Sequence, residues 1–420
     1  MSSTTKTTSA LRIIIHRGSH QIGGSCVEIA SDSTRLILDA GTPLDPSVSA
    51  APLVVPGLFS DGPPVAALLL SHAHPDHSGL LPLVRKEIPV WLTRGTSKML
   101  LAGKKFAAGV YLSKERSKIV EPGERKEIGD FAVTAYSVDH SIYGSVAWLI
   151  EHGNTRVLYS GDLRMRGRKE GMTRALVKAL AGRPLDALLL EGTHLSRDAR
   201  SPCVKERQLE TTITDLLRDA PALTLAMFSP QNLDRLVTFY KAARRTKRIF
   251  VVDLYTAFIM HLLHSEVEIP LPTAEAGMRV FFPTYRPRNI GDIERRFAAS
   301  RIELGEITAE PRRFLMLARA SMLDHDFTGG LPEKTRALYS QWNGYRKRKD
   351  QVGFERALAA CGGELIECHT SGHATVDDLV KLIGHLAPRC IIPMHTERPE
   401  RMRELVPNVR IAHDGEVIQI

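Results

Sequence analysis

The sequence predicts an α/β fold divided into two domains, and three observations lead to that prediction. At 420 residues the chain is too long for one small core, so two domains are expected. Short strand-like runs and turns fill roughly the first 195 residues, and strand-like and helical runs alternate from about 200 to 360. Because such alternation is typical of a parallel sheet, we expect the middle of the chain to form a sheet of its own.

The predicted strands of the first part are apolar runs separated by turn formers such as Gly23 and Gly24. These runs are 11–16, 26–30, 35–39, 65–70, 131–138, 145–150, 156–160 and 185–190. Helical spacing covers 205–219 and 233–244, and strand-like runs cover 223–228 and 249–254. The end of the chain returns to strand, helix and strand at 364–368, 376–385 and 390–393.

These runs predict the domain boundaries. We expect a flexible tail at 1–10, the first part of one domain at 11–198, an inserted domain at 199–360 and the completing part of the first domain at 361–420.

Bulk composition, with 43% hydrophobic and 25% charged residues, is that of an ordinary globular protein. No stretch approaches eighteen uninterrupted apolar residues, so no membrane partner is expected. Five scattered cysteines do not suggest a disulfide framework, and a reducing cytoplasm is the expected location. The formal net charge of +9 favours a polyanionic partner.

Four apolar runs end close to a residue that can bind a metal ion. These residues are His72, Asp162, Glu191 and His395, which follow the runs ending at 70, 160, 190 and 392. In α/β sheets ligands collect at the carboxyl ends of strands, so we expect one shared site.

The segment 72–77 carries the strongest chemical signal, because His72, His74, Asp76 and His77 place three imidazoles and a carboxylate within six residues. Alternate side chains of an extended segment point the same way, so His72 and His74 face one position and Asp76 and His77 a second. Imidazole and carboxylate suit zinc, manganese or iron(II). A pair of such metals can activate water and clamp a phosphoryl or carbonyl oxygen. The alternative, a solvated histidine-rich loop, fits this spacing poorly.

The segment 72–77 resembles the HxHxDH motif of the metallo-β-lactamase superfamily. Asp39, in Leu38-Asp39-Ala40-Gly41, resembles the first motif of that superfamily, which supports the metal loop. His140 resembles its third motif, and Asp162 its bridging carboxylate. The resemblance implies an αββα sandwich with two divalent metal ions at one rim, zinc in the first instance and manganese as the alternative.

Later motifs resemble the β-CASP branch of the superfamily, which contains nucleases of RNA and DNA. Glu191 is similar to motif A, His373 in Thr370-Ser371-Gly372-His373-Ala374 to motif B, and His395 to motif C. The form of motif B and the late Asp414-Gly415-Glu416-Val417 look like ribonuclease J and its prokaryotic relatives. The middle domain is then expected to be an inserted α/β β-CASP domain.

The resemblance also assigns roles to the site residues. The ligands of one metal would be His72, His74 and His140, those of the other Asp76, His77 and His395, with Asp162 between them. Expected catalytic residues are Asp76, Glu191, which helps to orient a ligand, and His373, which assists the leaving group or holds the scissile phosphate. Two departures stand out: Thr396 follows His395 where glycine is common, and the sequence ends at Ile420 without the extra domain of ribonuclease J, which leaves a homodimer open.

We therefore expect phosphodiester hydrolysis of RNA, or of single-stranded DNA, by metal-activated hydroxide. The expected substrate contacts are Arg164, Ser229, Ser371 and Gly372. Basic runs at 164–169 and 346–349 suit phosphates, and Tyr143, Tyr255, Trp342 and Tyr345 either stack on bases or belong to the core.

Two rival functions stay open at this point. A small-molecule hydrolase of a thioester, lactone or lactam would not need the inserted domain. A nucleic-acid-binding protein without catalysis would not need every expected ligand.

Overall fold

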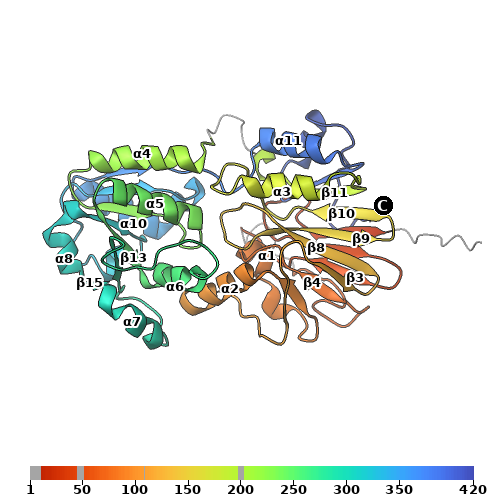
Figure 1. The fold of residues 1–420 in the computed structure, drawn as a ribbon, viewed down its shortest axis with the longest axis horizontal. Coiled ribbons are helices and arrows are strands. Elements are labelled where there is room, and N and C mark those ends of the chain that lie inside the picture. Colours follow the sequence, from red (N-terminus) through yellow and green to blue (C-terminus); the bar gives the residue numbers. More distant parts are fainter. Residues whose placement is uncertain (1–10, 45–51, 108, 197–202) are drawn as a thin grey trace, which may run out of the picture.

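The computed structural model describes residues 11–44, 52–107, 109–196 and 203–420. They form two lobes, a sandwich lobe built from both ends of the chain and an inserted lobe built from its middle (Figure 1). The predicted tail at 1–10 and the predicted boundary at 198/199 lie outside the described residues. Within the described ranges, every helix is too short or too polar to cross a lipid bilayer.

The first sheet of the sandwich lobe has seven strands. In spatial order they are β20 (Val417–Gln419), β1 (Arg12–Arg17), β2 (Cys26–Ala30), β3 (Arg35–Leu38), β4 (Ala67–Leu69), β5 (Val90–Leu92) and β6 (Ser117–Ile119). Every second residue of β1 is buried, because one face of the strand packs on the second sheet. Ile418 of β20 pairs with Ile13 of β1, so the two ends of the described chain share one sheet.

The second sheet has six strands and gathers the strand ends noted in the sequence. In spatial order they are β19 (Ile391–Met394), β11 (Ala187–Glu191), β10 (Thr155–Tyr159), β9 (Val146–His152), β8 (Phe131–Ser137) and β7 (Arg125–Ile128). Strands β10, β11 and β19 run parallel. Their carboxyl ends therefore bring Asp162, Glu191 and His395 to one edge.

The two sheets pack face to face around residues such as Phe131 and Trp148, and helices cover both outer faces (Figure 1). The helical elements of this lobe are α1 (Pro75–Ser78), η1 (Leu81–Leu83), α2 (Arg94–Phe106), α3 (Gly171–Leu180), η2 (Thr193–Ser196), α11 (Val376–Leu386) and η6 (Pro399–Glu404). α3 and α11 bury their apolar faces on the second sheet, and α2 covers the first. The αββα sandwich predicted from the sequence is confirmed.

The inserted lobe contains a third sheet whose seven strands all run parallel. In spatial order they are β15 (Arg301–Ile302), β14 (Met278–Phe281), β13 (Ile249–Asp253), β16 (Phe314–Leu317), β12 (Thr224–Met227), β17 (Arg336–Tyr339) and β18 (Glu364–Glu367). The helical elements around it are α4 (Glu206–Arg218), α5 (Leu233–Arg245), α6 (Leu254–Leu263), α7 (Gly291–Phe297), η3 (Ala298–Ser300), α8 (Leu304–Ala309), η4 (Pro311–Arg313), α9 (Met322–His325), η5 (Asn343–Lys347) and α10 (Lys349–Ala360).

One predicted boundary is corrected by the pairing of β18. Residues 361–420 were expected to complete the first domain, whereas Leu365 and Ile366 of β18 pair with Ala337 and Leu338 of β17. The sequence of β18, four residues long, does not indicate which sheet the strand joins. Its partner strand, β17, lies more than twenty residues earlier in the chain. The chain thus returns to the sandwich lobe after β18, directly into the predicted motif B.

The two lobes share a buried contact between α2 and α6. Phe106 stacks on Tyr255 with ring centroids 5.2 Å apart. Nearby, the ammonium of Lys98 donates to the carbonyl of Leu262 at 2.6 Å and pairs with Glu266. Apolar residues of both lobes belong to one continuous core, which fixes the inserted lobe against the sandwich.

Candidate metal centre

The loop after β4 holds four of the predicted donors. His74 is extended, with φ −64° and ψ 146°, and Pro75 starts α1, where a missing backbone N–H costs nothing. The extended backbone brings the rings of His72 and His74 to 4.9 Å. The first turn of α1 then directs Asp76 and His77 toward a second position.

The seven predicted ligands form two groups of donors, and a third, overlapping group joins His373 to His140 and Asp162. The first consists of His72, His74 and His140, and the second of Asp76, His77, Asp162 and His395; within each group the ligand atoms lie within 4.8 Å of one another. In the first group, the Nδ1 of His74 is 3.1 Å from the Nε2 atoms of both His72 and His140. The structure thus brings together all seven residues that the sequence singled out as ligands.

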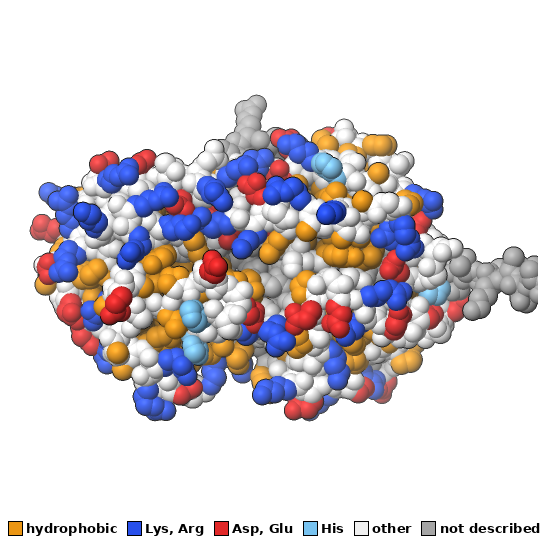
Figure 2. Space-filling model, in the orientation of Figure 1, with side chains coloured by type: hydrophobic (Ala, Val, Ile, Leu, Met, Phe, Trp, Pro, Cys, Tyr) orange, Lys and Arg blue, Asp and Glu red, His pale blue; other side chains and the backbone are white. Residues whose placement is uncertain are grey.

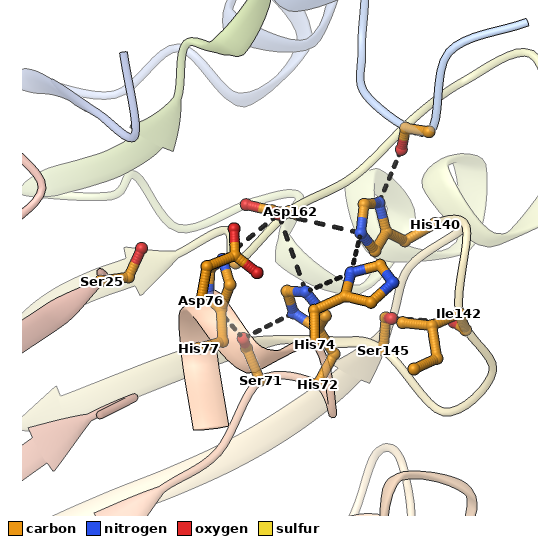
Figure 3. Close-up of polar contacts among 12 residues, drawn as sticks. Ser25, Ser71, His72, His74, Asp76, His77, His140, Ile142, Ser145 and Asp162 are labelled. Atoms are coloured by element: carbon orange, nitrogen blue, oxygen red, sulfur yellow. Dashed lines mark hydrogen bonds and ion pairs between the residues drawn. The ribbon is translucent and has the colours of Figure 1, made fainter. Parts of the chain in front are cut away.

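Asp162 lies between the two groups (Figure 3). Its Oδ2 atom is 3.2 Å from Nε2 of His77 and 3.7 Å from Nε2 of His395 on one side. On the other side it is 3.7 Å from Nε2 of both His72 and His140. A carboxylate in this position can share its charge between two cations.

The donor atoms fit bound metal ions. Among the described residues, the buried atoms Nε2 of His77, Nε2 of His395 and Oδ1 of Asp162 have no hydrogen-bond partner, although buried polar atoms normally have one. Burial lowers the pKa of His72 and of His140 well below 6.5, which leaves each ring neutral with a lone pair for a cation. For His77, burial lowers the pKa, but Asp162 and Asp39 raise it more, and a cation would replace that proton.

Asp39 supports this loop from behind. It is fully buried with a positive φ of 60°. Its carboxylate accepts hydrogen bonds, all of 2.7 Å, from the backbone N–H and the hydroxyl of Ser71, from Nδ1 of His77 and from the hydroxyl of Tyr159. The bond to His77 leaves Nε2 of that ring facing the site. The sequence indicated Asp39 but not Ser71 or Tyr159, although Ser71 directly precedes His72.

Two other ligands are oriented by residues that the sequence did not assign to this task. Nδ1 of His140 donates to the carbonyl of Gly372 at 2.6 Å. The hydroxyl of Ser25 lies 3.0 Å from Nδ1 of His395. Gly372, expected to contact substrate, thus positions a ligand in this structure.

Glu191 and His373 form a pair beside Asp162. Nδ1 of His373 is 3.2 Å from Oε2 of Glu191 and 3.9 Å from Oδ2 of Asp162. The side chain of Glu191 is 1% exposed and that of His373 is 22% exposed, so the imidazole faces the solvent side of the site. Burial lowers the pKa of His373, but the charges of Glu191 and Asp162 outweigh it and raise that pKa to about 9.

Ser371 lies in the same loop. Its hydroxyl accepts from the backbone N–H of His373 at 3.1 Å and is 2.8 Å from Nε2 of His194. His194 is not among the predicted site residues, although it lies three residues after the motif A residue Glu191.

Arg164 does not have the place expected of a substrate contact. The side chain is buried, and its guanidinium pairs with Asp139 at 3.0 Å and Asp234 at 2.6 Å. A cation so enclosed by carboxylates has no free face for a phosphate, and a basic run in the sequence cannot reveal that enclosure. Ser229, another predicted substrate contact, is exposed after β12. The residue that caps the start of α5 is Asn232 and not Ser229.

Two donor groups joined by Asp162 at the rim of an αββα sandwich, with a parallel α/β lobe inserted before His395, define a protein of the metallo-β-lactamase type with a candidate metal centre. Two family models and several relatives support placing the chain in the metallo-β-lactamase superfamily, in its β-CASP, ribonuclease J-like branch. Residues 34–223 match the family described as the beta-lactamase superfamily domain, and 363–406 the family described as the Zn-dependent metallo-hydrolase RNA specificity domain.

Similar proteins agree with this assignment. An RNase J-like protein of Methanocaldococcus jannaschii is 26% identical over 57% of each chain. A ribonuclease J of Mycolicibacterium smegmatis is 26% identical over 79% of this chain and 58% of its own length. The transcription termination factor FttA of Methanosarcina mazei is 22% identical over 61% of this chain and 44% of its own. The chain thus spans about half the length of these relatives.

A solved structure of a protein of unknown function from Enterococcus faecalis V583 has the same fold. It superposes with a TM-score of 0.80 at 22% identity, covering 98% of this chain and 100% of that one.

Proposed function

We propose that the chain is a ribonuclease that hydrolyses phosphodiester bonds with two divalent metal ions, zinc in the first instance. The observation that carries the proposal is the placement of His373. It is held by Glu191, partly exposed, and 3.9 Å from the carboxylate that joins the two donor groups. Relatives named RNase J-like protein and ribonuclease J support RNA as the substrate.

In such a reaction, some residues of the site would hold the metal ions and His373 would act on the leaving group. Metal ions held by the two donor groups would supply an activated water and neutralise charge on the phosphoryl oxygens. Asp39, Ser25 and the carbonyl of Gly372 hold the imidazoles of the ligands in place, as described above. His373, protonated beside Glu191, can donate a proton to the departing oxygen.

The first test compares His373→Ala with His385→Ala, an exposed histidine on α11. We expect His373→Ala to keep two metals per chain but to lose hydrolysis of labelled single-stranded RNA by about 10²–10⁴-fold, the usual contribution of a proton donor. His385→Ala should behave as wild type in metal analysis and in turnover. Near-normal turnover in His373→Ala would remove His373 from the mechanism, and loss of a metal would make it a ligand instead.

The same assay separates the rival functions. Hydrolysis of a thioester or lactone without hydrolysis of RNA would favour a small-molecule enzyme. Binding of RNA by metal-loaded protein without hydrolysis would favour a binding protein.

We also propose that the loop around Ser371 holds a terminal phosphate. The support is the position of its hydroxyl between His194 and the backbone of His373. Digestion of one RNA with either a 5′-monophosphate or a 5′-triphosphate should then proceed at different rates. Equal rates, with cleavage inside the strand, would indicate an endonuclease without an end pocket.

A further inference from the structure

The segment 342–349 of the inserted lobe lies next to the loop that carries His373. It follows β17, the neighbour of β18 in the third sheet, and parallel strands end at the same edge. The side-chain amide of Asn343 donates to Glu367 at 2.8 Å, and Arg346 donates to the other oxygen of Glu367 at 2.6 Å. Glu367 is the last residue of β18, and His373 follows six residues later.

Two aromatic rings of this segment are arranged as a platform. Trp342 is 50% exposed, and its ring meets that of Tyr345 edge to face with centroids 5.4 Å apart. The Trp342 ring also covers the Cα atom of Gly344, where a Cβ atom would collide with it. The guanidinium of Arg348 lies 4.1 Å over the ring of Tyr345. The indole is thus supported by the chain on one side and open to solvent on the other.

Of the four cations beside the platform, one is paired with carboxylates and three are not. Arg346 is neutralised by Glu355 and Glu367. Lys347, Arg348 and Lys349 are exposed, and none of them forms an ion pair within the part of the chain that the structure describes. Three positive charges therefore lie beside the exposed ring of Trp342 and the half-buried ring of Tyr345.

Trp342 and Tyr345 differ in their surroundings from Tyr143 and Tyr255, the other two aromatic residues considered in the sequence. Tyr255 is only 9% exposed and stacks on Phe106 between the lobes. Tyr143 is packed against the same core. Of the four aromatic residues considered, Trp342 and Tyr345 are the two that flank an exposed basic run beside the candidate site.

We propose that Trp342, Tyr345 and Arg348 form a stacking subsite for unpaired nucleobases, with Lys347 and Lys349 contacting the flanking phosphates. Any nucleobase offers a face to an aromatic ring, whereas the bases of a duplex are already stacked on one another. The subsite would therefore admit single strands to the metal centre and exclude duplexes. This inference rests on the proposed nucleic-acid substrate but does not depend on hydrolysis.

Trp342 supplies its own reporter for the test. The chain has three tryptophans, of which Trp148 is buried and Trp91 is packed against the sandwich core. We expect a uridine decamer of RNA, added to the metal-loaded full chain and read within seconds, to quench tryptophan fluorescence. The duplex that the decamer forms with its complement should not quench it, and Trp342→Phe should lose most of the signal.

Variants then test the affinity by fluorescence anisotropy of the labelled decamer. Tyr345→Ala and Arg348→Ala should each weaken binding about fivefold to a hundredfold, the usual effect of losing one stacked base. The matched control is Arg313→Ala, because Arg313 also lies over a ring, that of Phe314 at 5.9 Å, but on the surface beside Glu310. Thermal unfolding of each variant checks that the fold is intact.

The outcomes distinguish this inference from the proposed ribonuclease activity. Equal quenching by single strand and duplex, or equal affinity of Tyr345→Ala, Arg348→Ala and wild type, would overturn the stacking subsite even if RNA is hydrolysed. Selective quenching by the single strand without any turnover would support the subsite and reject the ribonuclease.

Discussion

Gly372 connects the inserted lobe to one candidate metal ligand, His140, through its backbone carbonyl. The bond to Nδ1 of His140 fixes which nitrogen of that imidazole is free. A Cβ atom on Gly372 would lie 2.6 Å from Oγ and 2.7 Å from Cβ of Ser141, the residue after His140. Glycine is therefore required by close approach to the ligand loop.

We predict that Gly372→Ala weakens metal binding about 10- to 100-fold, the usual cost of losing a partner behind a ligand. The matched control is Gly384→Ala on α11, where a Cβ atom would meet nothing within 4 Å. Metal retention during dialysis against a graded chelator measures the difference. Equal retention by the two variants would contradict the role given to the Gly372 carbonyl.

Glu28 provides a pH-dependent contribution to stability outside the site. Burial raises its pKa, but hydrogen bonds from His16 and Arg35 lower it more, to about 2. Because the folded-state pKa lies below the ordinary value of 4.5, this contribution is complete above that value and is lost as the pH falls toward 2.

We therefore predict that Glu28→Gln is less stable than wild type at pH 7 and that the difference shrinks between about pH 4.5 and 2. Denaturant unfolding at a series of pH values gives the comparison. A difference that is constant over this interval would show that the charge of Glu28 has no stabilising role.

At the scale of elements, the loop after β10 joins the two lobes through buried ion pairs, which we call the clamp. Arg164 and Arg168 of this loop pair with Asp234 and Glu210, which lie on α5 and α4 of the inserted lobe. Arg235 of α5 pairs with Glu206 at 2.8 Å and donates to the carbonyl of Thr370 at 3.1 Å. The inserted lobe thus holds both the loop that follows Asp162 and the loop that carries His373.

Removal of one partner from a fully buried ion pair leaves an uncompensated charge. We predict that Arg235→Met destabilises the fold by about 3–5 kcal/mol, because Glu206 is then buried without its cation. Arg245→Met, on the same helix but 56% exposed, should cost at most about 1 kcal/mol. Denaturant unfolding of both variants measures the two losses, and similar small losses would mean that the clamp contributes little.

At the scale of the whole molecule, lysines and arginines are spread over the face shown in Figure 2, densely in its upper part over α4 and α3. Many of them are paired with acids, so the net charge of +9 does not by itself locate a binding surface. Arg348, without a carboxylate partner among the described residues, is a better guide.

We predict that the logarithm of RNA affinity falls linearly with the logarithm of salt concentration, with a slope of about −0.7 for each phosphate neutralised on a single strand. Lys347→Ala, which removes a proposed phosphate contact, should reduce the slope by about one such unit, and Arg313→Ala should leave it unchanged. Titrations between low and moderate salt provide the measurement. Affinity that does not respond to salt would exclude phosphate contacts.

The sequence predicts what local spacing determines and misses what folding brings together. His72, His74, Asp76 and His77 stand within six residues, so their metal-binding chemistry follows from the sequence alone. Tyr159, by contrast, reaches Asp39 across 120 residues, and only the packing of the two sheets creates that contact.

Arg164 was misassigned for the same reason, because its carboxylate partner Asp234 lies 70 residues away on another lobe. The same holds for β18. It belongs to the third sheet because it pairs with β17, and the sequence around β18 does not indicate that pairing.

The pairing of β18 with β17 also sets a distance. The chain passes from β18 to His373 in six residues, so the register of an edge strand determines how far the imidazole extends toward Asp162. A slip of one residue would move the loop by about 3.3 Å and turn alternate side chains to the opposite face. The third sheet therefore sets the position of His373 relative to the candidate metal centre of the other lobe. Insertions or deletions between β17 and motif B would then change that centre as well as the stability of the fold.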